Sequence, residues 1–131
     1  MSTAYFAFLT YFAAGLVLLF AFMWIYVRLT PYKEFELIRS GNRTAAYALA
    51  GNILGYAVVL YTAIAHSVSW GDMMIWACVG LIAQYLAYQI THRVVIRDWA
   101  THVANDNMAA GILAAAISLA IGLLNAASMT Y

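Results

Sequence analysis

The stretch from residue 44 to residue 71, TAAYALAGNILGYAVVLYTAIAHSVSWG, contains no charged side chain and decides the fold class. It is longer than the ~20 apolar residues that a helix needs to cross the hydrocarbon layer of a bilayer. Three further uncharged stretches cover residues 1–27, 73–92 and 107–131. The sequence therefore predicts an all-α integral membrane protein with four transmembrane helices and little material outside them.

The composition agrees with this prediction and excludes several functions. Hydrophobic residues make up 66% of the 131 residues and charged residues only 8%, whereas a soluble domain carries about a quarter charged residues. A net charge of +1 does not suit a nucleic-acid reader, and the single cysteine, Cys78, excludes a disulfide scaffold. We expect one membrane domain, residues 1–131, without a separate catalytic domain.

All the cationic residues lie in or beside two connectors between the predicted spans. They are Arg28, Lys33, Arg39, Arg43, Arg93 and Arg97. Lys and Arg are retained on the cytoplasmic side of a membrane. The sequence therefore predicts cytoplasmic connectors and both termini outside the cytoplasm.

The first connector has the pattern of a short amphipathic helix. Thr30 is a suitable N-cap and Pro31 a suitable first helical residue. Its apolar positions, which recur every three residues, are Tyr32, Phe35 and Ile38. Its polar residues are Lys33, Glu34 and Arg39, and Gly41 ends it. We expect this helix to lie along the cytoplasmic membrane surface, with Glu34 on its polar side.

An offset of 65 residues aligns the two halves of the chain without a gap. Arg28 then matches Arg93, Asn42 matches Asn107, and Ala45 matches Ala110. Each half contains a span, a basic connector, an Asn and a span rich in small residues. The pattern predicts two parallel two-helix repeats, about 1–65 and 66–131, related by an axis along the membrane normal.

Small residues on the second and fourth spans are candidates for close helix packing. They are Gly51, Gly55, Ala110, Ala114, Ser118, Gly122 and Ala126. Because lipid offers little hydrophobic force between helices, association depends on close backbone approach. These residues would pack the two spans within one chain or join copies of the chain, and we expect a homo-oligomer.

Asn42 and Asn107 precede the same two spans and suit N-caps, which satisfy free amides of the first helical turn. The alternative is an anion site for a group such as a lipid phosphate, formed by the two helix N-termini beside Arg28, Arg43 and Arg93.

Within the spans, the candidate polar residues are Asn52, Gln84 and Asn125. Amides in hydrocarbon bond another helix or face water, so these residues are either interhelical contacts or a polar route. No Asp, Glu, Lys or Arg falls within a span, which weighs against a proton-coupled carrier.

We find no residues that indicate catalysis. His66 lies near the outer side while His92 and His102 lie near the inner side, so one metal ion would not bind all three. The chain lacks a recognisable nucleophile with a base, and it lacks a phosphate loop. We expect no enzyme, no metal and no cofactor.

Three segments carry a family resemblance: ELIRSGNRTAA at 36–46 with the glycines that follow it, NDNMAAG at 105–111, and LNAASMTY at 124–131. They resemble the YjfL-like family of small bacterial inner-membrane proteins, a family of unknown function with two copies of a two-span unit. Asp106 departs from the Gly that precedes this Asn in many second repeats, so the resemblance does not define that turn. It supplies no catalytic residues.

The resemblance also implies a cellular setting. Such proteins tend to be encoded beside paralogues of phage-shock protein A and polyamine- or glutathionylspermidine-type ligases, which implies envelope maintenance. From the residues themselves we weigh two functions, and we favour the first, because the cations gather on one side and small residues form stripes. One is a non-enzymatic oligomeric scaffold for envelope stress that docks anionic lipid, or a cytoplasmic partner like phage-shock protein A, on its basic inner face. The other is a subunit of a small ion or solute channel or transporter.

Overall fold

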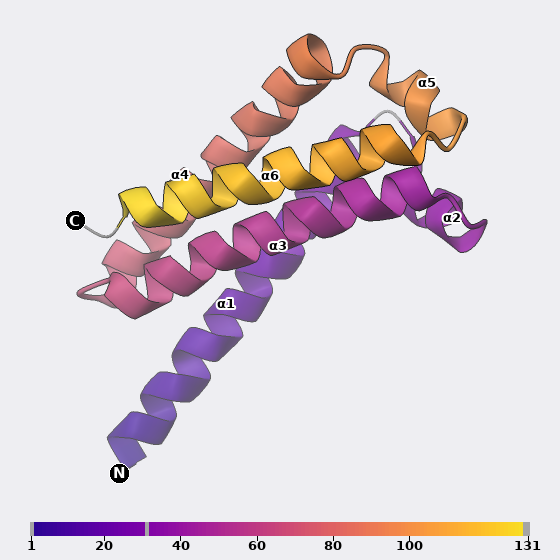
Figure 1. Cartoon of the computed structure of the whole chain (residues 1–131). Helices are drawn as coiled ribbons and strands as arrows, with labels where there is room; N and C mark the ends of the chain where they lie inside the picture. The colour runs from indigo at the N-terminus through magenta and orange to yellow at the C-terminus, as the bar shows by residue number, and fades with distance from the viewer. Residues whose placement is uncertain (1, 31, 130–131) are drawn as a thin grey trace.

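The computed structural model describes residues 2–30 and 32–129, and this part of the chain is helical with no strands. The long helices are α1 (Ser2–Leu29), α3 (Arg43–His66), α4 (Trp70–Ile90) and α6 (Met108–Ser128). Two short helices, α2 (Glu34–Arg39) and α5 (Trp99–Ala104), form the connectors, and a π-helical segment, Thr91–Val95, extends α4. Four helices are long and apolar enough to cross a membrane, as predicted. Both connectors lie at the same end of the bundle (Figure 1).

The centre of the structure is the seam between α3 and α6, which run side by side (Figure 1). A Cβ added to Gly51 would overlap the backbone of Ala115, and one added to Gly122 would overlap the backbone of Gly55. Ala114, Ser118, Gly122 and Ala126 are all buried. The small residues on these two helices therefore pack them within one chain.

The register of this small-residue stripe differs in one place from the sequence prediction. Ala110 is only half-buried. Its neighbour Gly111 makes the close approach instead, because an added Cβ there would lie 2.8 Å from Cα of Thr44. The stripe begins one residue later than predicted because the α3–α6 crossing places position 111, not 110, against the first turn of α3.

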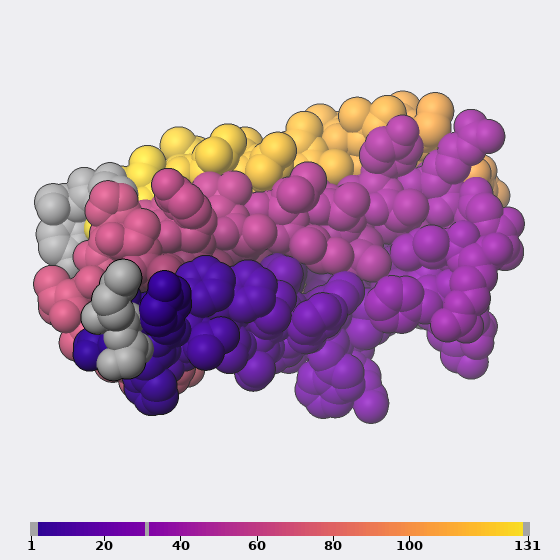
Figure 2. All heavy atoms as spheres, turned by 90° about the horizontal axis from the view of Figure 1, so that it is seen from below, coloured from indigo at the N-terminus to yellow at the C-terminus, as the bar shows by residue number. Residues whose placement is uncertain are grey.

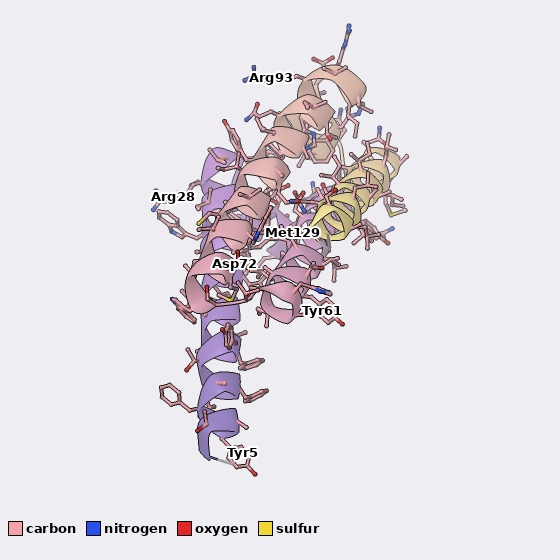
Figure 3. The ribbon with its side chains drawn as sticks, turned by 90° about the vertical axis from the view of Figure 1, so that its left-hand side faces the viewer. Tyr5, Arg28, Tyr61, Asp72, Arg93 and Met129 are labelled. Carbon is pink, nitrogen blue, oxygen red and sulfur yellow. The ribbon has the colours of Figure 1, made fainter. Side chains whose placement is uncertain are left out.

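Helix α1 is attached mainly through its C-terminal half. Only 11% of its spanning segment is buried, against 56% for α3. The Phe22 ring stacks on Tyr56 of α3 at 4.6 Å, and the Tyr56 hydroxyl donates to the Ala77 carbonyl of α4 at 3.0 Å. Near the other end, Tyr5 projects well beyond the remaining helices (Figure 3), and α1 stands on the surface of the bundle (Figure 2).

The first connector helix begins later than predicted. Thr30 is not its N-cap, because its hydroxyl donates back to the carbonyl of Val27 at 3.1 Å and so belongs to the end of α1. Lys33 holds the N-cap position without a side-chain bond, and Glu34 is the first helical residue. The predicted role of Pro31 lies outside the described residues. Gly41 follows the helix with φ +93°, which agrees with the predicted ending.

The same turn follows each connector helix, 65 residues apart. The amide of Asn42 donates to the Leu37 carbonyl, and the amide of Asn107 donates to the His102 carbonyl, both at 2.9 Å. Gly41 and Asp106 occupy the equivalent position with positive φ, at +93° and +50°. The short helix α5, which the sequence did not specify, corresponds to α2 at this offset. The duplication itself stays a prediction.

We predict that Gly122→Ala lowers the free energy of unfolding in detergent by about 1–3 kcal/mol, because the added methyl overlaps the Gly55 backbone. Unfolding in mixed micelles, followed by tryptophan fluorescence, measures this. Gly71→Ala is the control, since nothing lies within 4 Å of a Cβ at that position. Equal stability of the two variants would contradict the close seam.

Candidate functional site

Glu34 is the unexpected residue of the structure. We predicted it on the polar side of the connector helix, but its side chain is 2% exposed, so this prediction was wrong. The reason is that Ile38, one helical turn later on the same face, packs against Tyr26 and Leu49. The packing of Ile38 brings Glu34 inward with it. Neither carboxylate oxygen of Glu34 has a hydrogen-bond partner among the described residues.

A continuous set of aromatic rings lies beside Glu34 and crosses three helices. Tyr26 meets Tyr88 edge-on at 5.4 Å, Tyr88 meets His92 at 4.3 Å, and His92 meets Trp99 at 4.2 Å. The Trp99 indole N–H donates to the Tyr32 hydroxyl at 2.7 Å. Tyr26, Tyr32 and Tyr88 are close enough to Glu34 to interact with it electrostatically. The carboxyl thus lies among phenol groups.

This enclosure changes the protonation of the carboxyl. Burial raises the pKa of Glu34 to about 7, while the hydroxyls of Thr30 and Tyr32 pull the pKa down. These two hydroxyls approach the carboxylate without completing a hydrogen bond to it. Burial, followed by the negative charge of Glu34, also raises the pKa of Tyr32. Near neutral pH, Glu34 is therefore divided between its charged and neutral forms.

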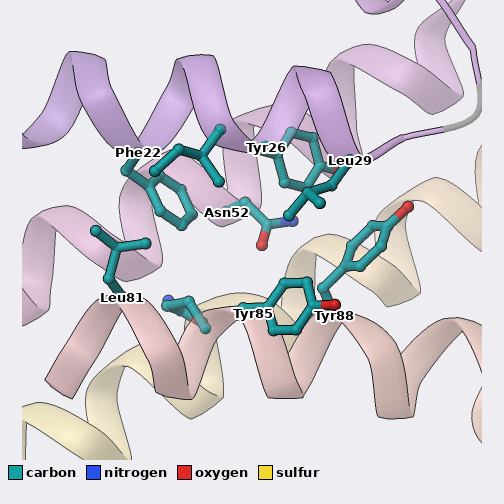
Figure 4. Close-up of a pocket in the computed structure, with 9 residues that line it drawn as sticks. Phe22, Tyr26, Leu29, Asn52, Leu81, Tyr85 and Tyr88 are labelled. Carbon is teal, nitrogen blue, oxygen red and sulfur yellow. The ribbon is translucent and has the colours of Figure 1, made fainter. Parts of the chain in front are cut away.

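A small cavity between α1, α3 and α4 lies next to this cluster. Its volume is about 20 Å³, which is enough for about one water molecule. Figure 4 shows Tyr26, Asn52 and Tyr88 around it, and Gln84 lines it too, but the atoms of the lining residues that face the cavity are apolar. The Tyr26 hydroxyl and the Oε1 atom of Gln84 are buried and have no hydrogen-bond partner in the described part of the chain.

The structure brings together two of the three predicted intramembrane amides. Asn52 donates to the Ala48 carbonyl of its own helix at 2.9 Å, so this bond is not interhelical. Gln84 Nε2 lies 3.5 Å from the Ser118 carbonyl of α6, a weak interhelical bond. Asn125 does not line the cavity and lies toward the other end of the bundle, with its Nδ2 buried and unpartnered within residues 2–30 and 32–129. Asn52 and Gln84 are therefore the pair that share a site.

The predicted anion site at the start of α3 is occupied by the chain itself. Asp106 Oδ1 accepts hydrogen bonds from the amides of Arg43 and Thr44, both at 2.9 Å, and from the Thr44 hydroxyl at 3.0 Å. These bonds, those of Thr44 first, lower the pKa of the Asp106 carboxyl. An external anion is therefore not needed at this helix end, because the second connector supplies a carboxylate.

The two predicted caps behave differently. Asn42 accepts from the Ala45 amide at 2.8 Å and donates to the Val103 carbonyl at 2.6 Å, so its capping role is confirmed. Asn107 holds the N-cap position of α6, but its side chain makes no capping bond and lies 3.0 Å from His102 Nδ1. The capping prediction is therefore wrong for the Asn107 side chain, which places its Nδ2 atom against His102 while its oxygen accepts no bond from the first turn of α6.

The cations that we grouped with these helix ends stay on the surface. Arg28, Arg43 and Arg93 are all exposed. The Arg28 guanidinium lies 4.9 Å from the centre of the Trp24 ring, on its own helix, where it makes a cation–π contact. The structure does not gather them around one anion.

Two residues that carry the site were missed by the sequence analysis, Glu34 and Asp106. The 65-residue offset contained a signal for the first, because it matches Glu34 to Trp99, which is a core residue in the structure. The same offset matches Asp106 to Gly41 and so marked the turn. It did not reveal that the carboxylate crosses to the other half of the chain.

Comparison with known proteins gives the family of the chain. The family model described as Domain of Unknown Function (DUF350) matches residues 1–129. The chain is 34% identical to the UPF0719 inner membrane protein YjfL of Escherichia coli strain K12, over 95% of this chain and 94% of that protein. It is 30% identical to the UPF0719 transmembrane protein YshE of Bacillus subtilis strain 168, over 91% and 90% of the two chains. No solved structure matches.

We predict that Asp106→Asn destabilises the protein at neutral pH and that the difference disappears in acid. The lowered pKa means that the carboxylate stabilises the fold above the ordinary aspartate pKa of about 4, and this contribution is lost as the pH falls below it. Asparagine tolerates the left-handed backbone of this position, so only the charge changes. Thermal unfolding from neutral to acidic pH tests this.

Asp98→Asn is the matched control, because Asp98 is also exposed and has a positive φ of +57°, but its side chain makes no capping bond. We expect this variant to follow the wild type at every pH. A loss as large as that of Asp106→Asn would refute a specific role for the bonds to α3.

Proposed function

This chain belongs to the DUF350 family of inner-membrane proteins, and we propose that it is a non-enzymatic channel or transporter subunit through which protons or water-sized species move. The observation that carries the proposal is a pair of buried polar atoms, Gln84 Oε1 and the Tyr26 hydroxyl, that have no partner within the described residues and belong to side chains around one small cavity. The cavity size limits the species to those no larger than water.

The energetic reasoning is as follows. A polar group left unpaired inside hydrocarbon costs several kcal/mol, so such groups persist where water or a solute satisfies them. The Glu34 carboxyl supplies a buried acidic group, whereas the Asp and Arg residues of the spans lie only near the span ends. Intramembrane ionisable groups are typical of proton and ion pathways. The scarcity of ionisable groups in the spans weighed against a proton pathway. Glu34, on the connector, provides such a group.

The direction of the pathway follows from the charges. We place the connectors in the cytoplasm and both termini outside, because all six cationic residues lie in or beside the connectors. Glu34 then lies at the cytoplasmic end of the bundle.

Flux through purified protein in liposomes tests the proposal. We expect wild-type protein to dissipate a proton gradient or to speed osmotic shrinkage, and Gln84→Leu to reduce the affected flux at least about tenfold, as ~1.4 kcal/mol on the barrier would do. Gln89→Leu is the control, since Gln89 is on the same helix but does not line the cavity. Wild-type protein without either flux would refute the proposal.

The second candidate is the scaffold, favoured by the arrangement of α1 and the connectors. The small buried fraction of α1 leaves it available to other copies in a homo-oligomer. The connector end carries six cations and four acids, Glu34, Glu36, Asp98 and Asp106, which gives it a formal net charge of +2. This surface would dock anionic lipid or a cytoplasmic envelope-stress partner like phage-shock protein A. Absence of flux, together with partner recovery that is lost when the six cations are neutralised, would favour this candidate.

Both candidates need the connectors on the cytoplasmic side, and cysteine labelling tests this. In a Cys78→Ala background, a membrane-impermeant maleimide is added to the side of the intact inner membrane that faces away from the cytoplasm. We expect it to label Gly71→Cys directly and Ser40→Cys only after permeabilisation. Both positions are exposed, so access depends on the side of the membrane. The opposite pattern would reverse the orientation.

A further inference from the structure

We infer that a groove between the second connector and the start of α6 binds an anionic phospholipid, with the phosphate at Arg97 and an acyl chain against the apolar part of the groove. The groove lies at the connector end of the bundle (Figure 1) and shares no lining residue with the cavity between α1, α3 and α4. In naming a lipid and its place, the inference rests on the second candidate function, the docking of anionic lipid, and not on flux through the protein.

The groove is large enough to hold part of a lipid. Its volume is about 510 Å³, within the ~300–1,000 Å³ of small-molecule pockets. The second connector forms one wall, and α6 forms the other through Ala109, Ala110 and Leu113.

The polar residues of the groove lie outside the spans and include a cation. They are Arg97, His102 and Asn107, whereas the neighbouring spans end at Val95 and begin at Met108. Arg97 is exposed and forms no ion pair within residues 2–30 and 32–129. The Asn107 amide donates to His102 Nδ1 at 3.0 Å, which places the ring proton on Nε2 as a further donor. A guanidinium and an imidazole N–H suit a phosphate, because it forms strong charge-assisted hydrogen bonds.

The apolar residues of the groove lie almost entirely within the spans. Val94 and Val95 come from the end of the third span, and Leu113 lies six residues beyond Asn107. At ~1.5 Å per residue, the groove therefore follows α6 for about 9 Å into the hydrocarbon. Val94, Val95 and Leu113 are all exposed, so the described chain does not cover this surface. A phospholipid has the same order of parts, with its phosphate at the surface and its acyl chain at depth.

The charges favour an anionic headgroup over a zwitterionic one. No Asp or Glu lines the groove. Asp106, next to Asn107, is bound to α3 instead, where its Oδ1 accepts the Thr44 amide at 2.9 Å. Asp98 follows Arg97 in the chain but is not part of the lining. Arg97 can therefore balance a phosphodiester, whereas the ammonium group of an ethanolamine headgroup would find no carboxylate.

This groove is not the anion site that the sequence predicted. That prediction combined the starts of α3 and α6 with Arg28, Arg43 and Arg93, and the structure fills the start of α3 with Asp106. The groove uses Arg97, which entered the sequence analysis only as one of the charges that orient the chain. Arg93 does not line it.

Native mass spectrometry of the purified full chain, titrated with phosphatidylglycerol or with phosphatidylethanolamine of the same acyl chains, tests the inference. We expect the wild type to bind phosphatidylglycerol more tightly, and Arg97→Gln to lower that affinity about fivefold, since one Arg contributes ~1 kcal/mol near anionic lipid. Arg93→Gln is the matched control, because Arg93 is exposed and carries the same charge but lies outside the groove. Equal affinities of the two variants, or equal binding of the two lipids by the wild type, would overturn the inference.

A second pair of variants tests the apolar part of the groove without changing the charge. Ala109 is exposed and lines the groove, so the ring introduced by Ala109→Trp would occupy the lipid's place without entering the packed interior. We expect a loss of phosphatidylglycerol binding comparable with that of Arg97→Gln. Ala116→Trp, at an exposed position of α6 outside the groove, should bind as the wild type does. Unchanged binding by the Ala109→Trp protein would count against the groove.

A soluble competitor distinguishes the lipid from a small anion. Glycerol phosphate carries the phosphate but no acyl chain, so an excess of it should not displace phosphatidylglycerol from the wild type. Displacement would show that the apolar part is not used and would refute the lipid assignment.

The outcomes also separate this inference from the proposed functions. Lipid binding that is lost when all six cations are neutralised, but that Arg97→Gln leaves unchanged, supports the second candidate and refutes the groove. Selective binding that Arg97→Gln weakens, in a protein without flux, refutes the channel and supports the groove.

Discussion

The close backbone contact between α3 and α6 is the constraint on which the other features depend. Hydrophobic force between helices is weak in lipid, so a stable core needs helices that approach within contact distance of their backbones. Gly51, Gly55, Gly111 and Gly122 permit this approach. Gly55 also leaves room for the Gln84 amide of α4, because a Cβ there would lie 2.5 Å from Gln84 Nε2. The packing that holds the bundle therefore also positions the polar side chain.

Both halves of the chain have the same turn after the connector helix, but a different residue occupies its positive-φ position in each half. Gly41 and Asp106 occupy equivalent places with the same backbone handedness, but only Asp106 has a side chain that reaches the start of α3. This carboxylate satisfies helix amides that would otherwise need an external anion. Together with the Asn42–Val103 bond, it ties the two connectors into one layer at the same end of the bundle. The side chains of Arg28, Arg43 and Arg93 remain exposed and take no part in these bonds.

Glu34 changes the functional interpretation because it is a buried acidic residue, whereas the charged residues of the spans lie only near the span ends. The connector that carries it is short, so the residue is placed by packing and not by its own preference for water. An acidic side chain in such a place is costly, and it is retained in proteins mainly where proton or ion binding repays the cost. The scaffold and transport hypotheses therefore differ in which part of the connector layer they use: its exposed cations or its buried carboxyl.

The sequence by itself determined the class of fold, the four spans, the turn glycine at position 41 and the helices that pack closely. These features depend on composition and on the backbone preferences of each segment, which do not require the rest of the fold. It also indicated Asn52 and Gln84 as polar residues at depth. The burial of Glu34, the reach of Asp106 to α3 and the separation of Asn125 from the other two amides were decided only by the tertiary structure. Each depends on which faces of distant helices meet, and a polar residue on a short helix has the same local pattern whether that face meets water or another helix.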